Sequence, residues 1–555
     1  GNVGSGENVI ATLKHFTAYG VPEGGHNAGM AHVGVRELLT ELSYPFEMAV
    51  KAGALSLMTA YNEVDGIPCT ANPFLTNQLL RDQWGFSGFV VSDLYAIDGL
   101  MSQRVAAGRD EAGILALRSG VDSDLGGNCF SADLVRACRE GRLAEADIDR
   151  AVSRILRLKF KMGLFDNPYV KVKKAEKLIG TSGHREVARE VARQSVVLLK
   201  NENQLLPLSK EVKRVAVIGP NADNVYNQLG DYTAPQAPGS VITVLEGIRQ
   251  KLPGAEVRYV KGCAVRDTLD TSIGEACETA KNSDVVVVVL GGSSARDFET
   301  DFLETGAAVA NERKVSDMES GEGFDRIGLS LMGKQVELLK ALYATGRPVV
   351  LVMVQGRPLE LNWAAEHIPA ILTTWYPGGE GGRAIADVLF GDYNPAGRLP
   401  LSYPRHVGQL PVYYNHKSAE RHDYVEGTAA PLYPFGFGLS YTTFVYEGID
   451  VRVEGDSVRV SVDVKNVGGR AGDEVVQLYL RDEQASVVTP FMQLKAFQRV
   501  HLTSGESRRV EFVLTEEHLR VLDTSLNWRV EPGWFTVMIG ASSQDIRQRT
   551  RFRID

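Results

Sequence analysis

The pattern of apolar and polar positions divides the chain into segments that follow different rules. In residues 1–168, short apolar runs alternate with amphipathic stretches, which is typical of a parallel α/β fold. The last amphipathic stretch has apolar positions at helical spacing and is followed by Gly163 and Pro168, so we expect it to be the closing helix of this segment. The expected strands are residues 9–16, 55–61 and 89–93, and the expected helices are residues 35–52, 76–83 and 147–161.

Residues 169–415 contain apolar runs without alternation, which indicate strands buried on both faces in a largely parallel sheet between helices. This segment is expected to be an α/β sandwich that opens with a helix at residues 184–201. A dinucleotide site at residues 217–221 is not favoured, because the second and third glycines of the GxGxxG pattern are missing. The expected strands are residues 215–219, 284–290, 348–354 and 370–375, and a further helix is expected at residues 334–343.

After a linker at residues 416–443, the apolar positions of residues 444–555 change to a period of about two. Alternation of this kind, with turns such as Val467-Gly468-Gly469 and no helical period, predicts an antiparallel β-sandwich of the fibronectin type III style. Strands are expected at residues 458–464, 474–480, 508–514 and 534–539.

Composition adds mainly exclusions to this picture of three domains. The net charge of −9 is spread along the 555 residues, which argues against a nucleic-acid or anionic-membrane partner. No apolar run reaches the roughly 20 residues that a membrane-spanning helix needs. The five cysteines are odd in number and lack CxxC spacing, so neither a zinc site nor a disulfide framework is indicated.

The cellular compartment stays open. The chain starts with Gly1 and shows no leader sequence, so we expect either that a signal was removed or that upstream sequence is missing. A periplasmic or extracellular location is favoured over a cytoplasmic one.

Several polar residues are expected where strands of the first segment end. Asp93 closes the run 89–93, and the carboxyl ends of strands carry the reactive groups in α/β barrels. The alternative role, a helix N-cap, is equally favoured on position alone. Lys14 and His15 end the strand-like run that starts with residues 9–13 and suit sugar hydroxyls, although a salt bridge and a satisfied histidine are favoured for them alone. Met58 and Tyr61 end the run 55–61 and are expected to be either pocket wall or core.

A second acidic group stands far along the chain, in the glycine-bearing loop 317–326. Glycines on both sides of Glu322 allow the backbone to move and a bulky ligand to approach. Composition alone favours a solvated acidic loop here. Residues 294–305 are also polar and acidic, so the whole region is a candidate lid.

Taken together, these residues resemble the family 3 glycoside hydrolases, the β-glucosidase and β-xylosidase family. The match covers nearly the whole chain, and the runs stand in the family's order. The runs that carry it are Lys14-His15-Phe16, Met58-Thr59-Ala60-Tyr61-Asn62, residues 84–93, Gly321-Glu322-Gly323-Phe324-Asp325-Arg326, residues 375–382, residues 394–400 and residues 433–441.

The resemblance implies a (β/α) barrel that is partial in this chain, an α/β sandwich and a fibronectin-like domain. It implies an exo-acting retaining β-glycosidase of terminal non-reducing β-D-glucosyl or β-D-xylosyl residues, a role compatible with cellulose degradation. Asp93 is then the nucleophile and Glu322 the acid/base, with Glu319 as runner-up because such loops vary in length. Retaining hydrolysis needs two carboxyl groups about 5–5.5 Å apart, one ionised and one protonated. No metal or other cofactor is required.

The resemblance also implies a set of side chains around the terminal sugar of an oligosaccharide or aryl β-glycoside substrate. Lys14, His15 and Tyr61 are expected to hydrogen-bond to it, with Met58 beside them. Where many β-glucosidases of the family hold an arginine, this chain offers His26, which leaves the preferred sugar open.

Barrels of this type have about eight strand–helix units in about 250 residues, more than residues 1–168 provide. The family's earlier units, with an aspartate and an arginine that hold the sugar, have no counterpart here. We therefore expect the missing part in a separate or cleaved N-terminal polypeptide or a longer parent chain, or a reduced barrel completed in a homodimer.

Two other functions are weighed against hydrolysis of glucosides or xylosides. A β-N-acetylhexosaminidase-like or phosphorylase-like relative would use a histidine acid/base, but residues 16–20 lack the Pro-Gly-His-Gly pattern of those relatives. A non-catalytic sugar-binding or scaffold protein is favoured only if the earlier barrel units are truly absent.

Overall fold

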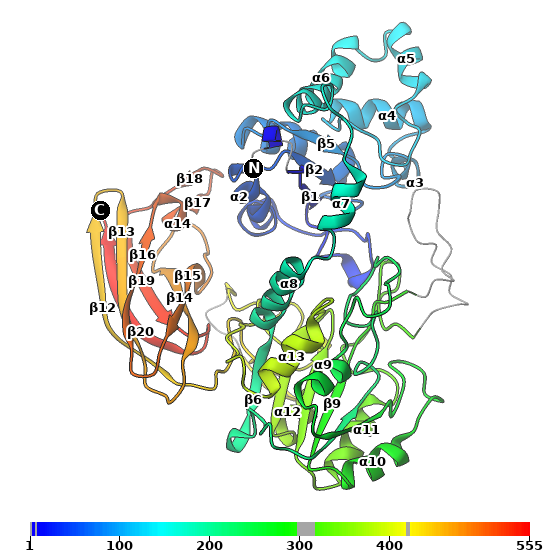
Figure 1. Cartoon of the computed structure of the whole chain (residues 1–555). Helices are drawn as coiled ribbons and strands as arrows, with labels where there is room; N and C mark the ends of the chain where they lie inside the picture. Colours follow the sequence, from blue (N-terminus) through cyan, green and yellow to red (C-terminus); the bar gives the residue numbers. More distant parts are fainter. Residues whose placement is uncertain (1–2, 6–7, 297–316, 418–421) are drawn as a thin grey trace. The chain divides into compact units, whose positions relative to one another are not determined.

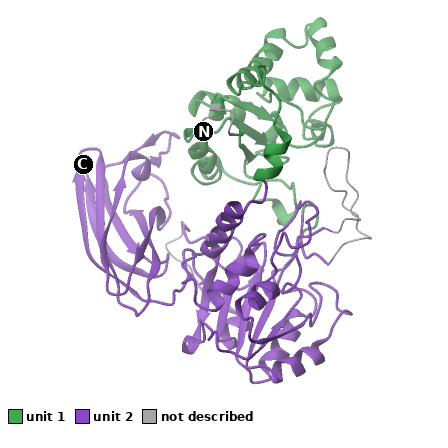
Figure 2. Ribbon diagram, in the orientation of Figure 1, with its two compact units in different colours: residues 1–178, 299–311, 322–325 green, residues 179–298, 312–321, 326–555 purple. Residues whose placement is uncertain are grey.

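The computed structural model describes residues 3–5, 8–296, 317–417 and 422–555 (Figure 1). Their contacts form two compact units, shown in different colours in Figure 2. Among the described residues, unit 1 holds those up to Leu178 together with Glu322–Asp325, and unit 2 holds the others. The short segment Glu322–Asp325 therefore belongs to unit 1 by its contacts, although its neighbours in the sequence belong to unit 2.

Unit 1 is built on a parallel sheet in the order β1 (Thr12–Phe16), β2 (Ser56–Thr59) and β5 (Phe89–Val91). Phe16, Leu57 and Val90, one from each strand, are fully buried in its core. The other elements are η1 (Val3–Ser5), η2 (Glu23–Gly25), α1 (Val35–Glu37), η3 (Leu38–Leu42), α2 (Tyr44–Lys51), β3 (Glu63–Val64), β4 (Ile67–Pro68), η4 (Cys69–Ala71), η5 (Phe74–Gln83), α3 (Gly99–Ser102), α4 (Arg109–Arg118), α5 (Ala132–Arg139), α6 (Glu145–Lys161) and α7 (Val172–Leu178).

A buried carboxylate fixes strand β5 to the surrounding helices. Asp122 Oδ2 accepts hydrogen bonds from the Val90 backbone N–H at 2.9 Å and from Arg81 of η5 at 2.7 Å. Asp122 Oδ1 accepts from Arg154 of α6 at 2.8 Å. Two guanidinium groups compensate this buried charge, and through Asp122 the strand that leads to Asp93 is linked to η5 and α6.

Unit 2 contains a six-stranded sheet in the order β6-β11-β10-β9-β7-β8, in which β6 alone runs antiparallel to its neighbour. The strands are β6 (Val197–Asn201), β7 (Arg214–Ile218), β8 (Glu256–Val260), β9 (Val285–Gly291), β10 (Val349–Val354) and β11 (Ala370–Trp375). The helices of this part are α8 (Ser182–Ser195), η6 (Glu202–Gln204), α9 (Val244–Lys251), α10 (Ile273–Lys281), α11 (Gln335–Tyr343), α12 (Asn362–His367), α13 (Gly381–Leu389) and η7 (Val407–Gln409).

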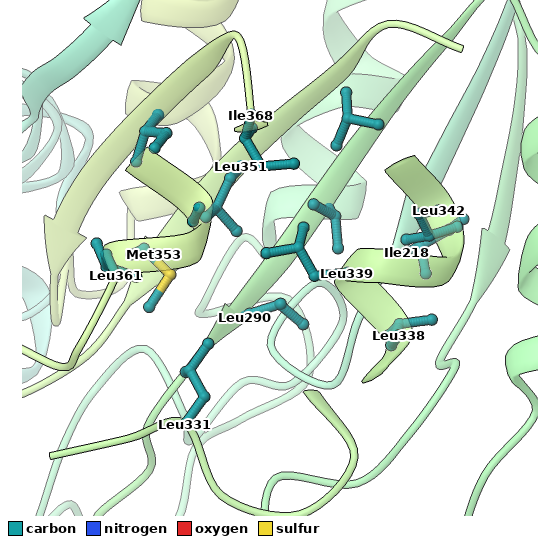
Figure 3. Packing of buried hydrophobic residues seen from close by; sticks show 14 of the residues in the cluster. Ile218, Leu290, Leu331, Leu338, Leu339, Leu342, Leu351, Met353, Leu361 and Ile368 are labelled. Atoms are coloured by element: carbon teal, nitrogen blue, oxygen red, sulfur yellow. The ribbon is translucent and has the colours of Figure 1, made fainter. Parts of the chain in front are cut away.

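The two faces of this sheet pack into separate cores. Alternate residues of β9 enter opposite clusters: Val286, Val288 and Leu290 face α10, α11 and α12, whereas Val285, Val287 and Val289 face α9 and α13. Figure 3 shows the first cluster, with Leu290 and Leu351 of the sheet near Leu339 of α11. All seven residues of β9 are buried, as the uninterrupted apolar run predicts.

A second buried carboxylate joins three helices of unit 2. Asp387 of α13 is fully buried and accepts hydrogen bonds from Arg189 and Arg193 of α8 and from Lys251 of α9. Burial opposes ionisation, but these three donors together hold the pKa of Asp387 below its usual value.

The helix expected at residues 184–201 is wrong in its last part. Helix α8 ends at Ser195, and residues 197–201 form β6, which pairs with β11. Val197 and Leu199 enter one core of the sheet while Val196 and Leu198 enter the other, so this run has the period of a strand. Pairing with a distant strand decides the outcome, which a local helical pattern does not reveal.

The C-terminal part of unit 2 is an antiparallel β-sandwich. One sheet has the order β12-β13-β16 and the other β15-β14-β19-β20. Every second residue of β13 from Val458 to Val464 is fully buried, which is the period-two pattern expected from the sequence. The elements are β12 (Phe444–Glu454), β13 (Ser457–Asn466), β14 (Gly472–Asp482), β15 (Gln493–Leu502), β16 (Ser507–Leu514), α14 (Glu516–Leu519), β17 (Val521–Leu522), β18 (Trp528–Arg529), β19 (Gly533–Gly540) and β20 (Ile546–Ile554).

The predicted fold class is confirmed, with two α/β parts followed by a β-sandwich. The proposed domain boundaries at residues 168, 415 and 443 stay predictions. Within the described ranges, each helix is too short or too polar to cross a membrane. All five cysteines are free thiols.

Candidate active site

Asp93 lies two residues beyond the carboxyl end of β5 and is 7% exposed. Its Oδ1 accepts a hydrogen bond from the Leu94 N–H at 2.7 Å, and its Oδ2 lies 3.3 Å from His15 Nε2. Oδ2 is buried and accepts no hydrogen bond from the described part of the chain. The interpretation of Asp93 as a helix N-cap is wrong, because the next helix, α3, starts at Gly99 and has Asp98 at its N-cap.

Three rings from two neighbouring strands surround this carboxylate. The His15 and Tyr19 rings meet edge to face with centroids 4.8 Å apart, and the Tyr19 and Tyr61 centroids are 6.2 Å apart. The Tyr61 hydroxyl donates to the Leu94 carbonyl at 2.8 Å. His15 belongs to β1, and Tyr61 follows β2 by two residues, so the cluster forms where the parallel strands β1, β2 and β5 end.

Burial and charge set the protonation of these rings. Burial lowers the pKa of His15, and Lys14 lowers it further, whereas Asp93 and Glu322 raise it. Burial, with Asp93 and Glu322, raises the pKa of Tyr19 to about 12 and raises that of Tyr61 as well. At neutral pH the imidazole is therefore largely uncharged, and both phenols keep the protons that they donate to the Leu94 carbonyl and to Asn27 Oδ1.

Glu322 acts on the same rings as Asp93. Its charge raises the pKa of His15, Tyr19 and Tyr61, and its own side chain is exposed. The loop is tied down through Asp325, whose Oδ2 accepts from the Asn27 backbone N–H at 3.1 Å. These residues all belong to unit 1, so the structure places the two candidate catalytic acids around one cluster of rings.

Glu319, the alternative acid/base, has different surroundings. It belongs to unit 2, is 6% exposed and forms an ion pair with the buried guanidinium of Arg326. Arg326 also donates to the Ser330 carbonyl at 2.6 Å. A carboxylate held by a buried cation is suited to a structural role, because removing it would leave that cation uncompensated.

The remaining predicted sugar contacts are placed as follows. Lys14 is exposed on β1, and its charge acts on His15. Met58 is half-buried on β2, in register with Val91 of β5. His26 has a side chain 77% exposed, and its Nδ1 lies 3.5 Å from Asp325 Oδ2, which links it to the Glu322 loop rather than to Asp93.

Two participants were not among the predicted site residues. Tyr19 follows His15 by four residues and lies just after the same strand. This position could have identified it as a candidate site residue. Its hydroxyl donates to Asn27 Oδ1 at 3.2 Å. The pairing of Asn27 with Asp325 spans 298 residues, and local sequence carries no signal for such a contact.

One group of described residues has the composition of a metal site. The ligand atoms of Asp98, Asp124 and Cys129 lie within 4.8 Å of one another. Asp98 is paired with Arg109 at 3.0 Å, and burial raises the pKa of the Cys129 thiol to about 12. One Asp98 oxygen is already paired with Arg109, and we assign no metal to this group.

Comparison with known protein families gives three matches along the chain. The glycosyl hydrolase family 3 N terminal domain matches residues 4–158, and the glycosyl hydrolase family 3 C-terminal domain matches residues 196–441. The fibronectin type III-like domain matches residues 474–543.

Individual proteins match over nearly the whole chain. A "Beta-xylosidase" of Formosa agariphila is 40% identical, covering 97% of this chain and 74% of its own length. A "Periplasmic beta-glucosidase" of Salmonella typhimurium is 36% identical, covering 98% of this chain and 73% of its own length. The crystal structure of a β-glucosidase from Listeria innocua in complex with glucose has a TM-score of 0.90 and 34% identity, covering 100% of this chain and 75% of that one.

Proposed function

Because this chain belongs to glycosyl hydrolase family 3 and is a glycoside hydrolase, we propose that it releases terminal, non-reducing β-D-glucosyl or β-D-xylosyl residues with retention of configuration. The family resemblance predicted from the sequence is confirmed. The two sugars in the proposal follow from the relatives, which include both β-xylosidases and β-glucosidases. A glycoside is the substrate class, and the choice between the two sugars belongs to the proposal.

In the proposed mechanism, Asp93 Oδ2 attacks the anomeric carbon while Glu322 gives its proton to the leaving oxygen. The glycosidic C–O bond breaks, the alcohol leaves and an ester between the sugar and Asp93 forms. Glu322, now a carboxylate, takes a proton from water, and the hydroxyl oxygen displaces Asp93 from the anomeric carbon. The free sugar keeps the β configuration because the carbon is inverted twice.

The sugar is proposed to be held by the residues at the strand ends. Lys14, His15 and Tyr61 contact its hydroxyls, Met58 forms part of the wall, and His26 replaces the arginine of other β-glucosidases. The Tyr61 phenol keeps its proton and donates it to the Leu94 carbonyl, so its oxygen can accept a hydrogen bond from a sugar hydroxyl. The largely neutral His15 ring can donate one hydrogen bond and accept another.

One observation carries the proposal: the buried Oδ2 of Asp93, which accepts no hydrogen bond from the described residues, lies beside His15 in a ring cluster on which Glu322 also acts. A nucleophile needs such an oxygen, since an atom committed to protein hydrogen bonds would have to lose them before attacking. Glu319 offers no comparable arrangement, because its charge is bound to Arg326.

The assignment is tested with aryl β-glycosides of activated and poor leaving groups. Asp93→Asn is expected to abolish turnover of both. Glu322→Ala is expected to hydrolyse the substrate with the poor leaving group roughly 10²–10⁴-fold more slowly. It should be partly rescued by azide, which yields a β-glycosyl azide.

Glu319→Ala is the matched control, expected to lose stability but to show no azide rescue. If azide rescues Glu319→Ala, and Glu322→Ala behaves like the parent, the acid/base role of Glu322 is refuted.

A panel of aryl β-glucoside, β-xyloside and β-N-acetylglucosaminide tests the substrate class. Turnover of the β-N-acetylglucosaminide alone would contradict the proposal.

We further propose that additional β/α units, in a longer parent chain, on a separate polypeptide or in a second copy of the chain, complete the sheet of unit 1. In the described residues β1 pairs with β2 alone, and the parallel sheet has three strands where a barrel of this kind has eight. An open strand edge beside apolar side chains tends to pair with another chain. Light scattering and intact-mass analysis of active protein decide this, because a fully active monomer of 60.6 kDa would refute it.

A further inference from the structure

Unit 2 contains a cavity of about 430 Å³ beside the sheet that carries β14, β19 and β20. Its apolar part includes Val412, Met492 and Met538, which are at most 8% exposed. Phe491 forms one wall and presents 44% of its surface to solvent. Cavities that bind small molecules are typically of about 300–1,000 Å³ and largely apolar, with a few polar groups that orient the ligand.

The charges at this cavity have one sign. Arg481 and Arg549 line it, and no aspartate or glutamate is among the lining residues. Arg481 is already engaged, since it donates to Glu483 Oε1 at 3.1 Å and its guanidinium lies 4.8 Å from the Phe491 ring centroid. In contrast, no carboxylate of the described residues pairs with the exposed side chain of Arg549, which extends from β20. An anion is the complementary ligand.

We propose that this cavity binds an aromatic carboxylate. The ring lies over the buried methionines beside Phe491, and the carboxylate pairs with Arg549. A flat ring suits apolar and thioether surfaces, which favour aromatic contacts. A pyranose fits the apolar part less well, because its hydroxyls would meet Val412, Met492 and Met538 there rather than the polar residues that line the rest of the cavity.

The proposal does not rest on the glycosidase activity and is tested by binding to the full chain. We expect 4-hydroxycinnamate and benzoate to bind in saturation-transfer NMR and calorimetry, and 4-hydroxybenzyl alcohol, which lacks the charge, to bind more weakly. Arg549→Gln should weaken 4-hydroxycinnamate binding about tenfold, because it removes a charge-assisted contact. Phe491→Ala should weaken the binding of both aromatic acids.

Arg553→Gln is the matched control: it lies on the same strand, outside the cavity, and should leave binding unchanged. The proposal is overturned if neither acid binds at millimolar concentration. It is equally overturned if the Arg549 and Arg553 variants bind alike, which would place the ligand elsewhere. Binding of glucuronate in preference to both aromatic acids would also overturn it, since a sugar acid would then be the ligand.

Discussion

Replacing Asp325 with alanine tests whether the proposed acid/base is held in place by the loop 322–325. Asp325 Oδ2 accepts from the Asn27 N–H at 3.1 Å and lies 3.5 Å from His26 Nδ1. A hydrogen bond to a charged group contributes about 1.5–3 kcal/mol. The Asp325 side chain is 32% exposed and that of His26 is 77% exposed, so we take the lower end, about 1.5 kcal/mol. If this energy is lost from the orientation of Glu322, proton transfer slows about tenfold.

The assay compares kcat/KM for two aryl glycosides that differ in leaving group. A poor leaving group needs the proton from Glu322, whereas 2,4-dinitrophenolate leaves without it. Asp325→Ala should therefore lower kcat/KM about tenfold for the poor leaving group and leave the activated substrate nearly unchanged. Asp325→Asn keeps a hydrogen-bond acceptor and should lower kcat/KM for the poor leaving group about threefold. His26→Ala should lower it less, because the His26 side chain is mostly in solvent.

The reasoning fails if Asp325→Ala lowers kcat/KM equally for both substrates, because the defect would then lie in sugar binding or in Asp93. It also fails if neither value changes while the thermal melt matches that of the parent. A melt at lower temperature would show a loss of folding, and the comparison between the two leaving groups would still separate that loss from a specific effect on the acid.

Three other predictions concern buried groups described above. Asp387→Asn should reduce the free energy of unfolding, measured by urea denaturation, by about 3 kcal/mol, because it removes the buried charge that compensates three cations. The control is Asp392→Asn, which should cost under 1 kcal/mol because the Asp392 side chain is 34% exposed. Because folding lowers the pKa of Asp387, the stability that this carboxylate contributes is present above about pH 4 and is lost as the pH falls through its folded pKa. The free energy of unfolding of Asp387→Asn should therefore fall less steeply in acid than that of the parent. Tyr61→Phe removes the hydrogen bond to Leu94 and should lower kcat/KM about fivefold, so an unchanged value would exclude a role for this bond. Asp93→Asn should lower the pKa of His15 further, as NMR titration would show, because Asp93 raises it; a higher pKa would contradict the arrangement of the two groups.

Long periodic segments made most of the fold predictable from the sequence. The apolar runs 348–354 and 370–375 correspond closely to β10 and β11, because strands buried on both faces need apolar side chains at every position. The pattern failed at β6, where five residues after a helix pair with a strand far along the chain. Local spacing cannot encode such a partner.

The positions of the candidate residues were predictable where they lie at or near the end of a strand, whereas their roles stay predictions. Asp93, His15 and Tyr61 stand at the ends of apolar runs, and parallel strands bring such ends together. The acid on the distant loop was assigned through family resemblance and glycine flanks, and its catalytic role stays a prediction. The attachment of that loop through Asp325 and Asn27 was not predictable, since it depends on how the chain returns to unit 1.

The valine-rich strand β9 has a consequence for the synthesis of the protein. Once folded, its side chains are shielded on both faces, and β7 and β10 occupy both of its edges. Its partner β10 begins 63 residues after Val286 in the sequence, so in a growing chain β9 can pair with β7 while its other edge stays open until much later residues emerge. Uncharged, β-branched stretches of this length readily stack with copies from other chains. Chaperone supply and low growth temperature during expression should therefore raise the soluble yield.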